Sequence, residues 1–190
     1  MRDTEFTVPS AKRDRRAALC GFDNDGRLTT LPQAPGGHAL AERPGDRTFE
    51  SGGQGLWSTL DDLAFARMLI GDDPLLRRET LAMMTSNQLT PGQRATTRML
   101  GQPIFATGHG YGMGVAVVTA PETADPLRCR GTVGTIGWPG AYGSWWQADP
   151  NDRSVLIFLS HNMVELQQMA RRIGLGVWDA IGRFHRIATS

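Results

Sequence analysis

The segment of residues 134–150, with the apolar run that follows it, constrains the fold more than any other part of the chain. It holds three of the five tryptophans and four glycines. Glycine inside a strand-like segment marks a bulge or a place where something approaches the backbone closely. Aromatic side chains beside exposed backbone amides are typical of a small-molecule cleft. The segment therefore predicts either a cleft wall or a tryptophan-rich hairpin of the core, and the residues alone do not separate the two.

A β-sheet is predicted around this segment. Residues 155–159 form a continuous apolar run, which is typical of a strand buried on both faces. The turn sequence at 149–152 predicts that this strand pairs antiparallel with the segment before it. Residues 115–118 predict a further strand, and residues 17–22 and 27–31 predict a hairpin around the turn sequence Asp-Asn-Asp-Gly. A calcium loop is excluded there because Gly21 stands where an acidic ligand is required.

Helices are predicted where apolar residues recur every three or four positions. The first begins at Ser58 and Thr59, because each is followed three residues later by an aspartate, as in a helix cap, and it ends at Gly71. The second covers residues 78–86, and the last begins near Asn162. The inward stripe of the last helix consists of Leu166, Met169, Ala170, Ile173, Val177 and Ile181. Residues 32–50 and 88–107 are predicted loops, and the glycine-rich residues 52–55 lack the lysine of a phosphate loop. The predicted fold class is α+β, an antiparallel sheet flanked by helices.

The length and the net charge of the chain limit the number of domains and the kinds of partner that we expect. A chain of 190 residues is long enough for one well-buried domain, here residues 1–190. The formal net charge of +1 predicts no nucleic-acid and no membrane partner. Cys20 and Cys129 form no C-x-x-C pair, so we expect two free thiols, no metal and no cofactor. The polar first residues carry no signal peptide, which favours a cytoplasmic location for the chain as it stands.

Several motifs, in order, resemble the β-lactamase-related serine hydrolases, the superfamily of class C β-lactamases, penicillin-binding D-Ala-D-Ala carboxypeptidases and related esterases. The resemblance covers essentially the whole chain. It is carried by Gly-Gly-Gln-Gly-Leu-Trp-Ser-Thr at 52–59, Met-Thr-Ser-Asn-Gln-Leu at 84–89, Gly-Tyr-Gly-Met-Gly-Val at 110–115 and the strand with Trp138. It implies a partial β-lactamase/transpeptidase-like fold and acyl transfer, in which a serine attacks a carbonyl and the acyl-enzyme is then hydrolysed.

The third motif of these hydrolases, Lys-Thr-Gly or a variant with histidine or tryptophan first, maps to Trp138-Pro139-Gly140. The resemblance then implies that the amide of Ala141 is one oxyanion donor and that His161 contacts the small acyl substrate. Gly140 suits a cleft wall, because without a side chain it lets the substrate lie directly against the backbone. Because Trp138 cannot pair with a substrate carboxylate as lysine would, the resemblance favours esterase-like activity over β-lactamase or carboxypeptidase activity.

Two motifs of the superfamily are absent. The first, Ser-x-x-Lys, cannot occur, because Lys12 is the sole lysine and Pro9 precedes it by three residues. Tyr-x-Asn is also missing, and Tyr142-x-Ser144 lies after the third motif, so we interpret it as coincidental. We therefore expect an inactive carboxy-terminal part of a longer hydrolase. Alternatives are a non-catalytic domain that binds a ligand or partner, and a chain that self-associates or pairs with the missing half.

Overall fold

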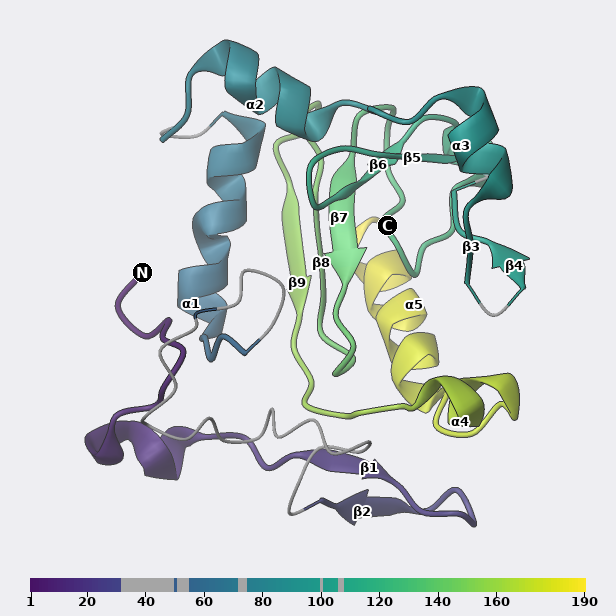
Figure 1. The fold of residues 1–190 in the computed structure, drawn as a ribbon. Coiled ribbons are helices and arrows are strands. Elements are labelled where there is room, and N and C mark those ends of the chain that lie inside the picture. The colour runs from purple at the N-terminus through teal and green to yellow at the C-terminus, as the bar shows by residue number, and fades with distance from the viewer. Residues whose placement is uncertain (32–49, 51–54, 72–74, 100, 106–107) are drawn as a thin grey trace.

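The computed structural model describes residues 1–31, 50, 55–71, 75–99, 101–105 and 108–190. Within these residues the fold is α+β, as predicted, and its centre is an antiparallel five-stranded sheet in the order β5-β6-β7-β8-β9 (Figure 1). The strands are β5 His109–Tyr111, β6 Ala116–Val118, β7 Ile136–Pro139, β8 Trp145–Ala148 and β9 Val155–Phe158. Most of the predicted loop 32–50 and of the glycine-rich segment 52–55 lies outside the described residues.

The tryptophan-rich segment forms a hairpin of two strands, β7 and β8, whereas the pairing predicted with residues 155–159 treated it as one strand. Ile136 pairs with Ala148 and Trp138 with Trp146. The predicted antiparallel pairing across residues 149–154 is confirmed, because β8 pairs with β9. The prediction that the 155–159 strand is fully buried is wrong. β9 lies at the edge of the described sheet and is half-buried, since helices pack on its faces while its outer side has no neighbouring strand.

The first predicted helix is divided between α1 (Leu60–Leu63) and the 3-10 helix η3 (Ala64–Ile70). It ends as predicted at Gly71, whose φ of +92° is a left-handed conformation that glycine adopts at little cost. Leu69 and Ile70 at its end pack against a buried cluster on one face of the sheet. That cluster consists of Val115, Val117, Ile136 and Ala148. The second helix, α2, covers Arg78–Thr85.

The last predicted helix is interrupted. It consists of α4 (Leu166–Ala170) and α5 (Gly176–Ala188), separated by a stretch in which Gly174 has a φ of +73°. Glu165, and not the predicted Asn162, caps α4. The side chain of Leu166 is 53% exposed and Ala170 is also exposed, so the predicted inward stripe is wrong at its start.

Helix α5 covers the face of the sheet opposite η3. Val177 and Ile181 are buried beneath it, as predicted. Phe184 contacts the rings of Trp145 and Phe158, with centroids 6.5 and 5.7 Å away. Figure 1 shows α5 beside the sheet, with α1 on the far side of β9.

The prediction of a loop over residues 88–107 is wrong. Helix α3 (Pro91–Thr96) is followed by the short hairpin of β3 (Arg98–Met99) and β4 (Gln102–Pro103). The helix begins at Thr90, whose hydroxyl accepts from the Gln93 amide while the Gln93 side chain accepts from the Thr90 amide. This reciprocal cap, with proline at the first helical position, lets a sequence without apolar periodicity form a helical turn.

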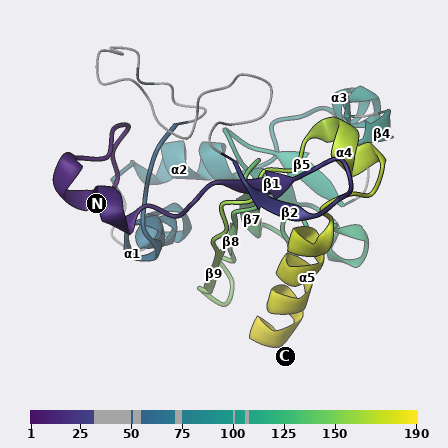
Figure 2. The ribbon, with the colours of Figure 1, turned by 90° about the horizontal axis from the view of Figure 1, so that it is seen from below.

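The amino-terminal part of the chain lies across the lower end of the sheet (Figures 1 and 2). The 3-10 helix η1 (Ser10–Arg15) precedes the predicted hairpin, which is β1 (Cys20–Phe22) with β2 (Leu28–Thr30). Cys20 exchanges backbone hydrogen bonds with the segment after β9, since its amide donates to His161 and its carbonyl accepts from Met163. The hairpin is thereby attached close to one of the predicted site residues. A further 3-10 turn, η4, covers Pro121–Thr123.

Candidate active-site wall

The predicted third motif lies where β7 turns into β8. The Gly140 amide donates to the Ser144 carbonyl at 2.6 Å, and the Gly143 amide donates to the Gly140 carbonyl at 3.0 Å. Gly143 has a φ of +76°, and a Cβ there would lie 2.5 Å from the Ser160 Oγ and 2.9 Å from the Val177 Cγ2. Both its conformation and its space therefore require glycine, and this holds the turn in one shape.

Ala141 lies at the tip of this turn and is exposed. Its amide and that of Tyr142 donate to no group among the residues that the structure describes, whereas the amides of Gly140 and Gly143, at the two ends of the turn, are both bonded. The preceding residue carries no side chain, so one face of the turn presents bare backbone. This arrangement can supply one fixed N–H donor to an oxygen that develops negative charge.

His161 lies against the same turn through Tyr142. The rings of Tyr142 and His161 have centroids 5.2 Å apart, and Trp57 meets His161 edge-on at 5.4 Å. The His161 Nδ1 donates to the Ala17 carbonyl at 3.1 Å. That bond occupies one ring nitrogen and orients the imidazole between two aromatic rings. The structure thus brings His161 and the Ala141 turn together.

Tyr142 is a residue that the sequence reasoning set aside. It belongs to the turn between β7 and β8, and not to the strand of Trp138. Its hydroxyl oxygen is buried, and no described residue hydrogen-bonds to it. Burial raises the pKa of this phenol, so it stays protonated at neutral pH. A buried hydroxyl without a partner costs about 1–3 kcal/mol, which makes Tyr142 a candidate donor to a bound group. In the sequence, the one signal for this donor role is that Tyr142 follows the third motif, Trp138-Pro139-Gly140, by two residues.

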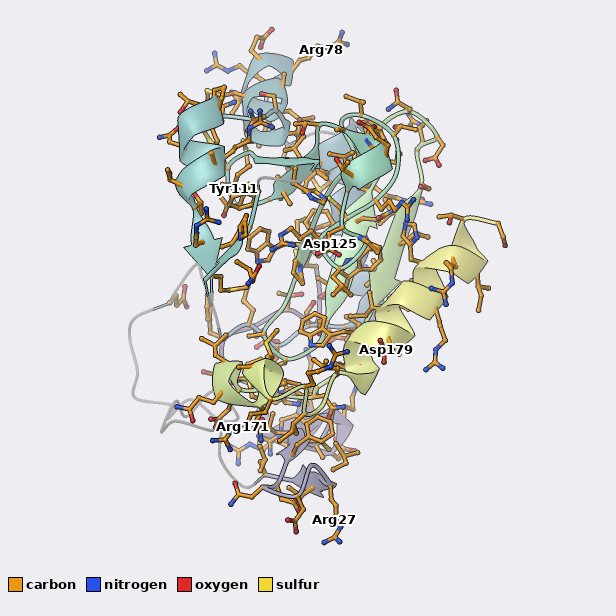
Figure 3. The ribbon with its side chains drawn as sticks, turned by 90° about the vertical axis from the view of Figure 1, so that its right-hand side faces the viewer. Arg27, Arg78, Tyr111, Asp125, Arg171 and Asp179 are labelled. Carbon is orange, nitrogen blue, oxygen red and sulfur yellow. The ribbon has the colours of Figure 1, made fainter. Side chains whose placement is uncertain are left out.

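Trp138 is directed into a different cluster. Its ring contacts Tyr111 edge-on at 5.4 Å and Phe105 at 6.5 Å between centroids. It also packs over the buried cluster of Ala116, Val118, Ala124 and Cys129 and remains half-buried. Figure 3 labels Tyr111, and Asp125 marks the loop of residues 124–129 that contributes to the cluster. No ring contact or hydrogen bond joins Trp138 to His161 among the described residues, so the predicted site residues form two groups.

The hairpin is supported by polar side chains that bond to the backbone of residues 128–130. Trp145, which is only 1% exposed, is one of them, so this tryptophan belongs to the core and not to a cleft wall. The bonds run from Trp145 Nε1 to the Arg128 carbonyl (3.0 Å), from His109 Nε2 to the Cys129 carbonyl (2.8 Å), from the Arg130 amide to Gln147 Oε1 (2.9 Å) and from His185 Nε2 to the Arg130 carbonyl (2.7 Å). Because buried backbone groups must be paired, these bonds hold residues 128–130 in place although these residues form no helix or strand.

Asp149 holds the next part of that segment. It is 2% exposed and accepts from the Thr132 amide and hydroxyl, the Thr135 hydroxyl and the Asn151 amide. Burial alone would raise the pKa of Asp149, but the hydrogen bonds from Thr135, Thr132 and Asn151 outweigh it and lower the pKa to about 2. The carboxylate therefore stays ionised and joins the end of β8 to the loop before β7.

The described residues contain no group of three or more histidine, cysteine, aspartate or glutamate side chains placed to hold a metal ion. The helices described here are all too short or too polar to cross a bilayer. Both cysteines are free, as predicted, and burial raises the pKa of the Cys129 thiol to about 12.

A sequence profile of the Beta-lactamase family matches residues 1–176. The chain belongs to the Beta-lactamase family. Protein Rv1367c of Mycobacterium tuberculosis is 38% identical to it over 172 residues, which are 87% of this chain and 41% of that protein. The chain thus spans less than half the length of this relative.

Two solved structures share the fold. EstCE1, described as a hydrolase with promiscuous acyltransferase activity, is 23% identical with a TM-score of 0.64 and covers 95% of this chain and 46% of its own. The unliganded simvastatin synthase LovD from Aspergillus terreus is 21% identical with a TM-score of 0.61 and covers 84% of this chain and 41% of its own. At such identities these likenesses show the fold and nothing finer.

Proposed function

We propose that this chain supplies one wall of an acyl-transfer site, formed by Trp138-Pro139-Gly140 and the Ala141 amide, in a β-lactamase-like serine hydrolase or acyltransferase. The observation that carries the proposal is the turn itself. The amides of Gly140 and Gly143 are bonded and a left-handed glycine holds the shape of the turn, while the Ala141 amide has no described partner and is exposed beside a residue that has no side chain. A preorganised donor of this kind is what a tetrahedral intermediate requires.

The preference that we propose is for neutral acyl esters. A lysine at position 138 could pair with the carboxylate of a β-lactam or peptide, whereas the half-buried Trp138 ring presents apolar surface. The description of one matched structure, EstCE1, as a hydrolase with promiscuous acyltransferase activity supports acyl transfer as the reaction class.

The nucleophile must come from elsewhere in this proposal. Lys12 is the sole lysine, and its ammonium forms ion pairs with Asp3 at 2.8 Å and Glu5 at 3.1 Å. No serine precedes it by three residues. We therefore propose that the chain acts as the carboxy-terminal part of a longer hydrolase. The same observation supports the alternative, a non-catalytic domain that binds its ligand on the turn.

The test is a chimera in which this chain replaces the matched 172 residues of Protein Rv1367c. We expect a fluorophosphonate probe to label the chimera and to leave the isolated chain unlabelled. Ala141→Pro removes the proposed oxyanion N–H, and we expect kcat for a p-nitrophenyl ester to fall about 10²–10³-fold. Ala141→Ser retains the N–H and serves as the matched control.

Three results would contradict the proposal. Labelling of a serine in the isolated chain would refute an external nucleophile. Equal kcat values for the proline and serine variants, both folded, would refute the oxyanion role. A chimera that binds but does not turn over any ester would favour the non-catalytic alternative.

A further inference from the structure

Two of the motifs that indicated the family lie against each other in the structure. The Tyr111 amide of β5 donates to the Asn87 Oδ1 at 3.1 Å, and the Tyr111 carbonyl accepts from the Gln88 amide at 2.8 Å. The segment after α2 is thereby bonded to both backbone groups of one residue of β5. The motifs at residues 84–89 and 110–115 therefore form one structural unit.

The glycines of the second motif make room for the first. A Cβ on Gly110 would overlap the Asn87 side chain, and a Cβ on Gly112 would overlap the Met84 carbonyl, which accepts from the Met113 amide at 2.9 Å. Neither glycine has a positive φ, so a left-handed backbone is not the reason for glycine at these positions. The reason is space, since any larger residue at position 110 would displace Asn87.

The Asn87 carboxamide is fixed at both of its ends. Its Oδ1 accepts from the amides of Tyr111 and Leu89, each at 3.1 Å, and its Nδ2 donates to the Leu89 carbonyl at 2.9 Å. Because the oxygen faces two donors and the nitrogen faces one acceptor, the amide group has a single favourable orientation. The half-buried Asn87 side chain thus holds the backbone of Tyr111 in place.

The position of Tyr111 determines where the ring of Trp138 lies. The Tyr111 ring meets the Trp138 ring edge-on at 5.4 Å between centroids, and it contacts the Phe105 ring at 5.3 Å. Phe105 is 7% exposed and also contacts Trp138, at 6.5 Å, so the three rings are packed together. Since packed rings hold each other in preferred orientations, a displacement of Tyr111 would move the Trp138 ring.

We propose that Asn87 is a positioning residue of the acyl-transfer site, which holds Tyr111 and, through Tyr111, the ring of Trp138. The consequence for substrates rests on the proposed function, in which Trp138 belongs to the wall of the site. A fixed Trp138 ring gives an apolar surface for the chain of a longer acyl group such as butyryl. An acetyl group has one methyl to place there and gains less from it. Asn87 then sets the preference for acyl length without contacting the substrate.

Fluorine NMR of the chain itself tests the positioning. With 5-fluorotryptophan in place of the five tryptophans, the Trp138 signal is assigned by its loss in Trp138→Phe. We expect Asn87→Ala to shift the Trp138 signal by more than its line width and to leave the signal of the core residue Trp145 in place. Gln88→Ala is the matched control, because it retains the backbone amide that donates to Tyr111.

Variants of Tyr111 test the next step of the same link. Tyr111→Leu keeps the amide that donates to Asn87 but removes the ring that contacts Trp138, and we expect it to shift the Trp138 signal as well. Tyr111→Phe keeps the ring and should leave this signal close to its original position. An unmoved signal in Tyr111→Leu breaks the link, whether or not Asn87→Ala folds.

The chimera with Protein Rv1367c tests the consequence for substrates. We expect Asn87→Ala in the chimera to raise KM for p-nitrophenyl butyrate about tenfold and to leave KM for p-nitrophenyl acetate within about twofold. The kcat values for both esters should also stay within about twofold, because Asn87 does not contact the reacting atoms in this proposal. A purely structural role would instead lower the active fraction, and thus kcat, equally for both esters.

Several results would overturn the inference. An unmoved Trp138 signal in folded Asn87→Ala is one, and an equal shift of all the tryptophan signals is another. Equal losses of kcat for the two esters, with unchanged KM values, would also contradict it. A chimera that turns over no ester would refute the proposed function, and the Trp138 signal of the isolated chain would still decide the positioning role.

Discussion

Replacing Asp149 by asparagine should destabilise the chain by about 2–3 kcal/mol at neutral pH. Both carboxylate oxygens accept from a fixed backbone amide, since Oδ1 accepts from Asn151 and Oδ2 from Thr132, each at 2.9 Å. Whichever way the asparagine amide is turned, its NH2 group faces one of these N–H donors. The variant therefore buries an unpaired donor and also loses the charge.

The magnitude follows from the pKa of Asp149. A fall from 3.8 to about 2 corresponds to about 2 kcal/mol of stabilisation by the ionised form. Because the folded-state pKa is the lower one, this stabilisation is fully present above pH 4 or so and is lost as the pH falls toward about 2. The difference between the two proteins should therefore shrink over that range.

The assay is urea denaturation of the original chain and of Asp149→Asn at neutral and acidic pH. Asp152→Asn is the matched control, because Asp152 is exposed and accepts one bond, from the Ser154 amide. We expect the control to change the free energy of unfolding by less than about 0.5 kcal/mol. Equal midpoints for Asp149→Asn and the original chain at neutral pH would refute the reasoning. So would a difference that grows as the pH falls.

Two further predictions concern the site turn and the thiols. Gly143→Ala should destabilise the chain by more than about 1 kcal/mol, because the φ of Gly143 is +76° and the new Cβ would meet Ser160 and Val177. Gly92→Ala is the matched control, because a Cβ at Gly92 would have open space and should not destabilise the chain. Thermal unfolding of the two variants compares them. In the native chain, iodoacetamide should label the half-buried Cys20 and spare Cys129, because burial raises the pKa of the Cys129 thiol to about 12. Both cysteines should react in urea. Fast labelling of Cys129 in the native chain would contradict its burial.

Local signals in the sequence predicted the elements that depend on local chemistry. The Asp23 turn formed as expected, with the Asp23 Oδ1 accepting from the amides of Asp25 and Arg27. The helix end at Gly71 and the pairing of β8 with β9 were also predicted, and the ordered motifs indicated the family that the profile match confirms. The roles of Trp138, Gly140, Ala141 and His161 in binding or catalysis stay predictions.

The errors arose where a short pattern fits more than one structure. The helix at Pro91–Thr96 depends on a cap and not on periodicity, so a search for apolar spacing missed it. The apolar run of β9 has the pattern of a central strand, but whether a strand has one neighbour or two depends on the rest of the sheet. The break before α5 was only indicated by its glycines, since a glycine is compatible with both a helix and a turn.

By itself, the sequence determined the family, the fold class and the turn before residues 155–159, because these depend on motif order, composition and turn residues. Only the tertiary structure decided which tryptophan belongs to the core, which amides of the turn have no described partner, and that Tyr142 contacts His161. These facts depend on how segments far apart in the chain pack together. Spacing along the sequence carries no record of such contacts.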